Sequence, residues 1–326
     1  MPRPYQIAVV AVLAASTLAC QSRPPESSQA TAAPATAVPA ATAAAQVEPS
    51  APTFKELANA AYKGVEEAGG PFTLADGKWE GQPYEPGAAS RPSVTLVRNF
   101  RLARDLDGDG REEAVVVVAG ATGGTGETSY LAVVRRTAAG LENAATAPIG
   151  DRVQLRDGRL DGRRIVLDVV QGGQDDAGCC PGDLVTRTWE LEAGALKEGA
   201  PTTTGRLSPT VLDGTEWVLR SWAWEEAAPA TPEVTLKLEG SRFVGSAGCN
   251  SYFAPVKAGA QPGDLKLGPV GTTRKMCPEA EMAVEKRFTA QLAGVQQLRF
   301  TGGQLALPYA KTDQSFGVML FERRAK

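Results

Sequence analysis

The chain has 326 residues, with 34 Lys and Arg against 37 Asp and Glu and a formal net charge of −3, so it lacks the basic excess that attracts nucleic acid. It contains no histidine, which excludes Ser-His-Asp and Cys-His catalysis and zinc sites built on His. Because no other catalytic constellation stands out, we expect a protein that is not an enzyme.

Residues 1–19 are typical of an export signal. Arg3 gives a short positive start, and residues 7–19 form an apolar segment that is too short for a comfortable membrane span. The segment ends in Ser-Thr-Leu-Ala-Cys20, which resembles a bacterial lipobox, where cleavage precedes the cysteine and the cysteine carries the lipid. The alternative is an ordinary secretory signal that leaves Cys20 spare. Gln21 follows, and the sorting rule of Gram-negative lipoproteins then implies an outer-membrane lipid anchor.

Residues 20–52 are rich in Ala, Pro and Thr and predict a disordered tether, because they bury too little apolar surface to offset the entropy lost on ordering. A first β-rich domain is expected over residues 53–200. Thr53 and Glu56 fit a capping box, and apolar residues at helical spacing continue to Val65. Further along we expect a hairpin turn at Asp76-Gly77 and strands over 94–97, 114–118, 130–134, 153–155, 165–170 and 185–191.

The acidic stretch RDLDGDGREE predicts a metal loop. Asp105, Asp107 and Asp109 alternate with other residues, and close carboxylates repel one another unless a cation lies between them. An EF-hand would need Glu at the twelfth position, which is Val116, so the loop is not an EF-hand. Glu113 stands ninth and a strand follows, and this spacing resembles the calcium loops of integrin-type FG-GAP repeats. The resemblance implies a structural Ca²⁺ held by Asp105, Asp107, Asp109, the carbonyl of Arg111, and Glu113. The alternative is a polar Asp/Gly turn that binds no metal.

The next segment, VVVVAGATGGTG, has glycines spaced as in a variant dinucleotide-binding turn. That turn requires a helix to follow, whereas residues 128–134 are β-branched and aromatic. We therefore expect a glycine-rich connection between two strands and no nucleotide cofactor.

Four cysteines remain after Cys20, and three pairings are possible in an oxidising compartment. Cys249 and Cys277 both lie in the C-terminal part, and a bridge between them would add about 3–4 kcal/mol of stability. Cys179 and Cys180 would then be left together, with Cα atoms about 3.8 Å apart, below the usual disulfide range. A vicinal disulfide, two thiols and a metal or redox site all stay open for this pair.

A second β-rich domain is expected over residues 210–326, after a linker at residues 199–209. Its helix is predicted over residues 281–295, with one apolar face. Its strands are predicted over 217–222, 234–238, 243–245, 298–300, 305–307 and 316–321.

Three motifs lie in this second domain: Trp217-Val218-Leu219, GSAGCNSYF at 245–253 and TRKMCP at 273–278, with Glu285 ahead of Phe288 on the helix. Together they resemble the META domain, the HslJ-like family of bacterial envelope lipoproteins. The resemblance implies a small β-rich domain with one helix, an association with heat-shock response and novobiocin resistance, and no established reaction. Gly248 and Asn250 suit a tight backbone corner. We expect Arg274 to pair with a carboxylate or a ligand, and these residues, with Pro278, to specify the fold.

The fold expected is α+β and predominantly β: two small β-rich domains, each with about one helix, after a lipoprotein signal and a disordered tether. The function expected is that of a non-enzymatic outer-membrane lipoprotein, related to stress or drug resistance, that binds an envelope protein or a small ligand. One alternative is a calcium-dependent adhesion or recognition module. The other is a hydrolase that uses Asp175 and Asp176, although adjacent side chains diverge on a strand.

Overall fold

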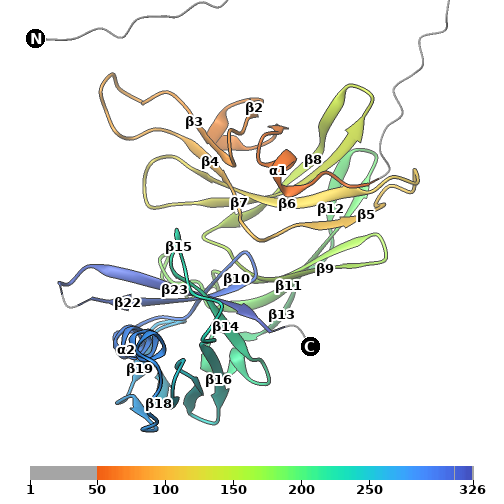
Figure 1. Cartoon of the computed structure of the whole chain (residues 1–326). Coiled ribbons are helices and arrows are strands. Elements are labelled where there is room, and N and C mark those ends of the chain that lie inside the picture. The colour runs from red at the N-terminus through yellow and green to blue at the C-terminus, as the bar shows by residue number, and fades with distance from the viewer. Residues whose placement is uncertain (1–49, 312, 325–326) are drawn as a thin grey trace, which may run out of the picture. The chain divides into compact units, whose positions relative to one another are not determined.

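The computed structural model describes residues 50–311 and 313–324, which belong to one compact unit (Figure 1). Within this part the chain is predominantly β, with antiparallel sheets and the α-helices α1 and α2. No helix found there is long and apolar enough to cross a membrane. The predicted signal peptide, Cys20 and most of the predicted tether lie outside the described residues.

The ordered chain begins before Thr53, where the sequence placed its start. Ala51 is only 4% exposed, and Pro52 is also buried. The guanidinium of Arg101 donates hydrogen bonds to the carbonyl oxygens of Pro52 (2.7 Å) and Ala51 (3.4 Å). The last residues of the predicted tether are therefore packed against the domain.

The N-terminal part contains short helical segments and strands up to residue 151. These are α1 (Phe54–Leu57), β1 (Ala61–Tyr62), the 3₁₀ helix η1 (Glu66–Ala68), β2 (Phe72–Thr73), β3 (Lys78–Glu80), β4 (Ser93–Leu96), β5 (Leu102–Arg104), β6 (Glu113–Ala121), β7 (Thr128–Thr137) and β8 (Gly140–Asp151). Strands β3-β4-β6-β7-β8 form the N-terminal sheet in that order, and β5 also pairs with β6.

Helix α1 is much shorter than predicted. The capping box is confirmed, since the Thr53 side chain accepts from the Glu56 N–H and the Glu56 carboxylate accepts from the Thr53 N–H. The helix nevertheless ends at Leu57, and Tyr62 then pairs with Phe72 in a two-stranded sheet. Gly64, with φ of 78°, breaks the helical pattern. Leu57, Tyr62 and Val65 of the predicted helix are still buried, the latter two from non-helical backbone, whereas Ala61 is exposed.

The N-terminal sheet is buried on both faces, which explains its run of four valines. Val116 and Val118 of β6 pack with Leu57, Tyr62 and other residues of the first segment. Val115 and Val117, which alternate with them along the strand, point to the other face of the sheet. There they pack with the apolar residues of a second sheet. A strand covered on both faces is hydrophobic throughout instead of alternating.

The second sheet, called here the middle sheet, follows directly. It consists of β9 (Gln154–Asp161), β10 (Arg164–Gln171), β11 (Asp183–Glu192), β12 (Ala195–Glu198) and β13 (Thr202–Arg206). All six strands predicted between residues 94 and 191 overlap observed strands. The predicted linker at 199–209 is wrong in part, because β13 pairs with β11 within it. Strand β8 was missed because its sequence, GLENAATAPIGD, has few β-branched residues.

The C-terminal part forms one long sheet with a helix. Its elements are the 3₁₀ helix η2 (Pro209–Leu212), β14 (Trp217–Ala223), β15 (Glu226–Ala227), β16 (Thr235–Glu239), β17 (Arg242–Ser246), β18 (Ser251–Ala258), β19 (Leu265–Leu267), β20 (Gly271–Thr272), α2 (Glu279–Ala293), β21 (Arg299–Thr301), β22 (Gln304–Ala310) and β23 (Phe316–Arg323). The strand order is β19-β18-β17-β16-β14-β23-β22-β21, with β15 beside β14 and β20 beside β18.

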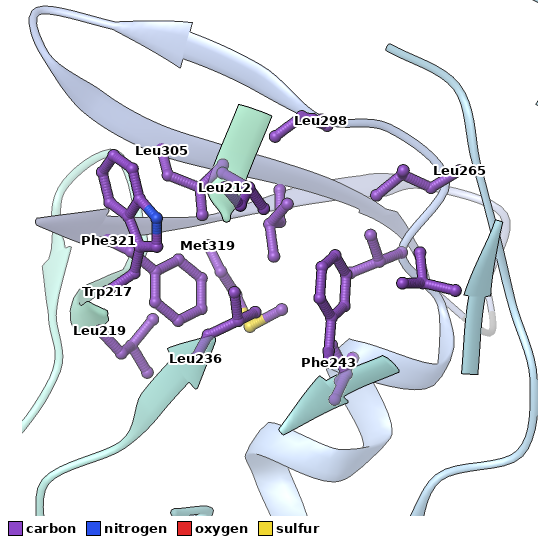
Figure 2. Packing of buried hydrophobic residues seen from close by; sticks show 14 of the residues in the cluster. Leu212, Trp217, Leu219, Leu236, Phe243, Leu265, Leu298, Leu305, Met319 and Phe321 are labelled. Carbon is purple, nitrogen blue, oxygen red and sulfur yellow. The ribbon is translucent and has the colours of Figure 1, made fainter. Parts of the chain in front are cut away.

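The core of this part lies between the curved sheet and α2. Figure 2 shows Trp217, Phe243 and Phe321 packed among leucines and Met319. Helix α2 presents Phe288 and Leu292 to this core, as the helical spacing predicted. Strand β18 was not predicted, although its exposed and buried residues alternate regularly.

Candidate functional site

The acidic loop connects β5 to β6, two strands that pair antiparallel, with Arg104 opposite Glu113. Gly108 and Gly110 have φ of 86° and 85°, in the left-handed region that favours glycine. The strand pair thus fixes both ends of the loop, and the glycines allow the backbone between them to turn tightly.

The loop brings three of the predicted ligands together. One carboxylate oxygen from each of Asp105, Asp107 and Asp109 lies within 4.8 Å of the others. Oxygens bound to one Ca²⁺ at about 2.3–2.6 Å lie at most about 5.2 Å apart, so this spacing fits a single ion. All the donors are oxygens, the ligand type that Ca²⁺ prefers.

Hydrogen bonds inside the loop already hold these carboxylates in place. The two oxygens of Asp105 accept from the N–H groups of Gly108 (2.6 Å) and Gly110 (3.1 Å). Asp107 accepts from the N–H of Asp109 (3.1 Å), and Asp109 accepts from that of Arg111 (2.8 Å). The loop is therefore a preformed series of turns, and the same bonds would serve a polar turn without a metal.

Glu113 stands apart from the three aspartates but acts on the same loop. Glu113 is 0% exposed, and its Oε2 accepts a hydrogen bond from the N–H of Leu106 at 2.7 Å. Its Oε1 is buried with no hydrogen-bond partner among the described residues. Burial raises the pKa of this carboxyl, and the negative charges of Asp107, Asp109 and Asp105 raise it further. A buried carboxylate with an unpaired oxygen beside other anions is costly unless a cation or a proton neutralises it.

Arginines neutralise the loop only in part. Arg135 Nη1 lies 3.5 Å from an Asp107 oxygen, while its Nε donates to Glu142 at 3.0 Å. Arg111 Nη1 lies 3.8 Å from Asp109. Sequence reasoning missed Arg135, although the pairing of Ala114 with Val134 places it beside the start of β6.

The glycine-rich segment after this loop is a hairpin connection, as predicted. Strand β6 pairs antiparallel with β7, which follows directly, with Gly120 opposite Thr128. A dinucleotide-binding turn leads instead from a strand into a helix.

Both cysteine pairs lie at disulfide distance. The Cα atoms of Cys249 and Cys277 are 5.9 Å apart, and those of Cys179 and Cys180 are 3.8 Å apart. The structure joins each pair by a disulfide.

Asp176, one of the two adjacent aspartates near Cys179, has an ion-pair partner and two backbone partners. The Asp176 side chain is 3% exposed, forms an ion pair with Arg206, and accepts from the N–H groups of Gly173 (2.7 Å) and Gly182 (2.8 Å). Arg206 lowers the pKa of Asp176, the opposite of the shift that a general acid requires. Asp176 thus closes the loop that carries the cysteines.

The GCN and TRKMCP motifs meet at Asn250, which is 4% exposed. Glu285 of α2 accepts from the backbone N–H and the side-chain Nδ2 of Asn250, both at 2.9 Å. Asn250 Oδ1 accepts from Thr273 Oγ1 and from the Lys275 N–H, both at 2.7 Å. One side chain thus connects the corner, the 273–275 segment and the helix.

The remaining motif residues are Gly248, Pro278 and Arg274. Gly248 has φ of 110°, and an added Cβ would lie 3.1 Å from Val284. Pro278 is the N-cap residue of α2. Arg274 is exposed, and the carboxylate or ligand expected to pair with it stays a prediction.

Part of the chain is similar to known proteins. No curated protein matches the chain. An NMR structure of a protein from Burkholderia xenovorans is similar to it, with 22% identity, 36% of this chain and 87% of that chain covered, and a TM-score of 0.28. The META domain family model matches residues 210–321, which include the Asn250 corner and helix α2. Residues 210–321 therefore form a META domain in the C-terminal part of the chain.

Proposed function

We propose that this META domain protein is a non-enzymatic outer-membrane lipoprotein whose N-terminal sheet is stabilised by Ca²⁺ in the acidic loop. In this role it binds an envelope protein or a small ligand. The lipid anchor is supported by the sequence around Cys20, and the calcium site by the geometry of the loop.

The observation that carries the calcium proposal is the combination of the aspartate cluster with Glu113. Three carboxylates lie within 4.8 Å of one another. A fourth, outside that cluster, is fully buried, has one oxygen without a partner among the described residues, and has its pKa raised by burial and by the charges of the three. Asp105, Asp107 and Asp109 would hold the ion, and the carbonyl of Arg111 and Glu113 are the further ligands that the spacing suggests. The ion would supply positive charge where the arginines supply too little.

Two observations support a non-enzymatic role. The sequence has no histidine, and Asp176, half of the alternative catalytic pair, is occupied by Arg206 and two backbone N–H groups. The neighbouring Asp175 is exposed.

A thermal melt of the purified protein in excess Ca²⁺ and then in chelator tests the calcium site. A ligand at 100 times its dissociation constant stabilises the native state by about 2.7 kcal/mol. We expect the melting temperature to be higher in Ca²⁺ by on the order of 5 °C. Asp107→Asn and Asp109→Asn should each remove most of this shift, because they replace an anionic ligand by a neutral one.

Asp175→Asn is the matched control, since it neutralises an exposed aspartate outside the loop and should leave the shift unchanged. Equal melting temperatures with Ca²⁺ and with chelator would reduce the loop to a polar turn. Mg²⁺ at the same concentration shows whether the effect is specific to the larger ion.

A calcium-dependent recognition module is the second candidate. Asp109 and both loop glycines are exposed, so an ion in this loop would lie near the surface and within reach of a partner's carboxylate. A pull-down from envelope extracts with and without chelator distinguishes the two functions, at a temperature where the protein stays folded in chelator. If the ion is purely structural, we expect the same partners in both samples. If the ion takes part in recognition, we expect partners to be lost in chelator.

A further inference from the structure

A groove lies in the META domain, between the tips of two hairpins and beside α2. The first hairpin is β14–β15, the second is β22–β23, and Figure 1 shows α2 close to the second. The groove has a volume of about 610 Å³ and is open to solvent. We propose that it binds a neutral saccharide.

Two aromatic side chains line this groove and are largely exposed. Trp224, in the turn of the first hairpin, is 61% exposed, and Phe316, at the start of β23, is 70% exposed. The lining also includes small residues, namely Ala223, Ala290 and Gly317. Large aromatic surfaces left in water beside a hollow mark a binding site more often than chance exposure.

A fixed ion pair supplies the polar side of the groove. Arg287 of α2 donates two hydrogen bonds to Glu226 of β15, at 2.5 and 2.7 Å, and its guanidinium lies 4.6 Å from the ring centre of Trp222. Arg287 lowers the pKa of Glu226, so the carboxylate stays charged at neutral pH. Two of the five guanidinium N–H donors are used here, and the carboxylate has further lone pairs.

These features select the ligand by its chemistry. The ion pair has no net charge, so it offers donors and acceptors together without favouring an anion or a cation, and only Lys311 adds a charge. A pyranose ring has an apolar C–H face that stacks on aromatic rings and hydroxyls that both donate and accept. A flat apolar ligand would stack equally well but would leave the ion pair desolvated and unmatched. An open groove also suits a chain that extends beyond it better than a small molecule that needs enclosure.

The proposal rests on the binding role proposed above but not on the calcium loop. The calcium melt and the saccharide titration are separate measurements on different sheets of the protein, so either one can fail alone.

The test is a titration of the purified protein with chitotriose, cellotriose and maltotriose, followed by tryptophan fluorescence and calorimetry. We expect saturable binding of at least one of the three with a Kd of about 1 mM or tighter. Trp224→Ala and Phe316→Ala should each weaken it by about tenfold, because each removes one stacking surface. Trp224→Tyr should retain most of the affinity, since it keeps a ring at that position.

Tyr84→Ala is the matched control, because Tyr84 is 58% exposed but does not line the groove. Thermal melts of all variants show that each is folded. The proposal is overturned if none of the three saccharides binds, if binding is unchanged in both aromatic variants, or if an apolar dye occupies the groove and the saccharides fail to displace it.

Discussion

The acidic loop and the Asn250 corner were both recognised from short polar motifs, yet their structures differ in one respect. In the corner, a 4%-exposed asparagine has partners for its backbone N–H, its Nδ2 and its Oδ1. In the loop, a 0%-exposed glutamate keeps one oxygen without a partner among the described residues, and burial and the charges of three aspartates raise its pKa.

This difference supports the proposal that the corner is a structural motif and the loop a ligand site. A buried polar group that is fully hydrogen-bonded needs nothing more and specifies the fold. A buried polar group that lacks a partner raises the free energy of the folded state until something binds or a proton is taken up. Asn250 is therefore satisfied within the META domain without a ligand. Glu113 instead keeps one buried oxygen that a proton or a cation would neutralise.

The disulfides give the largest expected effects. The Cys249–Cys277 bridge closes the corner across a sequence separation of 28 residues, so the loop-entropy relation predicts a loss of about 3–4 kcal/mol in the double Cys→Ser variant. The Cys179–Cys180 bridge joins adjacent residues, and its double Cys→Ser variant should lose less than about 1 kcal/mol.

Urea unfolding of both variants under oxidising conditions measures this contrast. Equal losses in the two variants would show that the vicinal pair contributes through native contacts of its loop and not through chain entropy. The residues around Asp176 would then form a second structural motif like the Asn250 corner.

Asn250→Ala should cost about 3 kcal/mol of unfolding free energy, because it leaves Glu285 and the 273–275 segment without buried partners. Asn59→Ala is the matched control: Asn59 also makes two side-chain hydrogen bonds, to Lys55 O and from the Asp76 N–H, but it is exposed. We expect the control to lose less than about 1 kcal/mol. Denaturant unfolding checks both, and a loss that depended on calcium would contradict the assignment of the corner as purely structural.

Much of the fold was predictable because it depends on local patterns. The strands with β-branched runs, the Asp76-Gly77 turn and helix α2 all carry their signals within a few residues. Helix α1 was predicted too long because Tyr62 forms a long-range pair with Phe72, which apolar spacing alone does not reveal. Strand β8 was missed because its ten pairings with β7 compensate for weak β propensity.

The candidate sites were predictable to different degrees. The spacing of the aspartates gave the cluster, since the loop closes on itself over a few residues. The partners Arg135 and Glu285 come from other elements, and only the sheet register or the packing of α2 identifies them. The aromatic groove was not predicted at all, because Trp224 and Phe316 are 92 residues apart (316 − 224) and carry no motif.

Arg135→Gln tests whether the acidic loop binds Ca²⁺ in competition with an arginine. Arg135 lies 3.5 Å from Asp107 and competes with a bound cation, so its removal should raise the Ca²⁺ affinity by about fivefold, the equivalent of about 1 kcal/mol at a hydrated surface. Arg159→Gln is the control, because Arg159 pairs with Asp168 and is not paired with the loop carboxylates. Calorimetric titration with Ca²⁺ measures both. If Arg135→Gln left the Ca²⁺ affinity unchanged, repulsion at Asp107 would not limit binding.

The smallest expected effect is the pH dependence of stability that Glu56 contributes. Glu56 is paired with an arginine, so it serves as a reference for Glu113. Hydrogen bonds from Arg136 hold the pKa of Glu56 at about 2, below its ordinary value of 4.5, whereas burial raises the pKa of Glu113. The stability that Glu56 contributes is therefore fully present above pH 4.5 and is lost as the pH falls toward 2. The Glu56 side chain is 39% exposed, so solvent screening limits the loss to less than about 1 kcal/mol. Melting temperatures of Glu56→Gln between these pH values should decline less than those of the native sequence. Parallel profiles would mean that Arg136 does not pair with Glu56 in solution, and that other carboxylates carry the acid sensitivity of this domain.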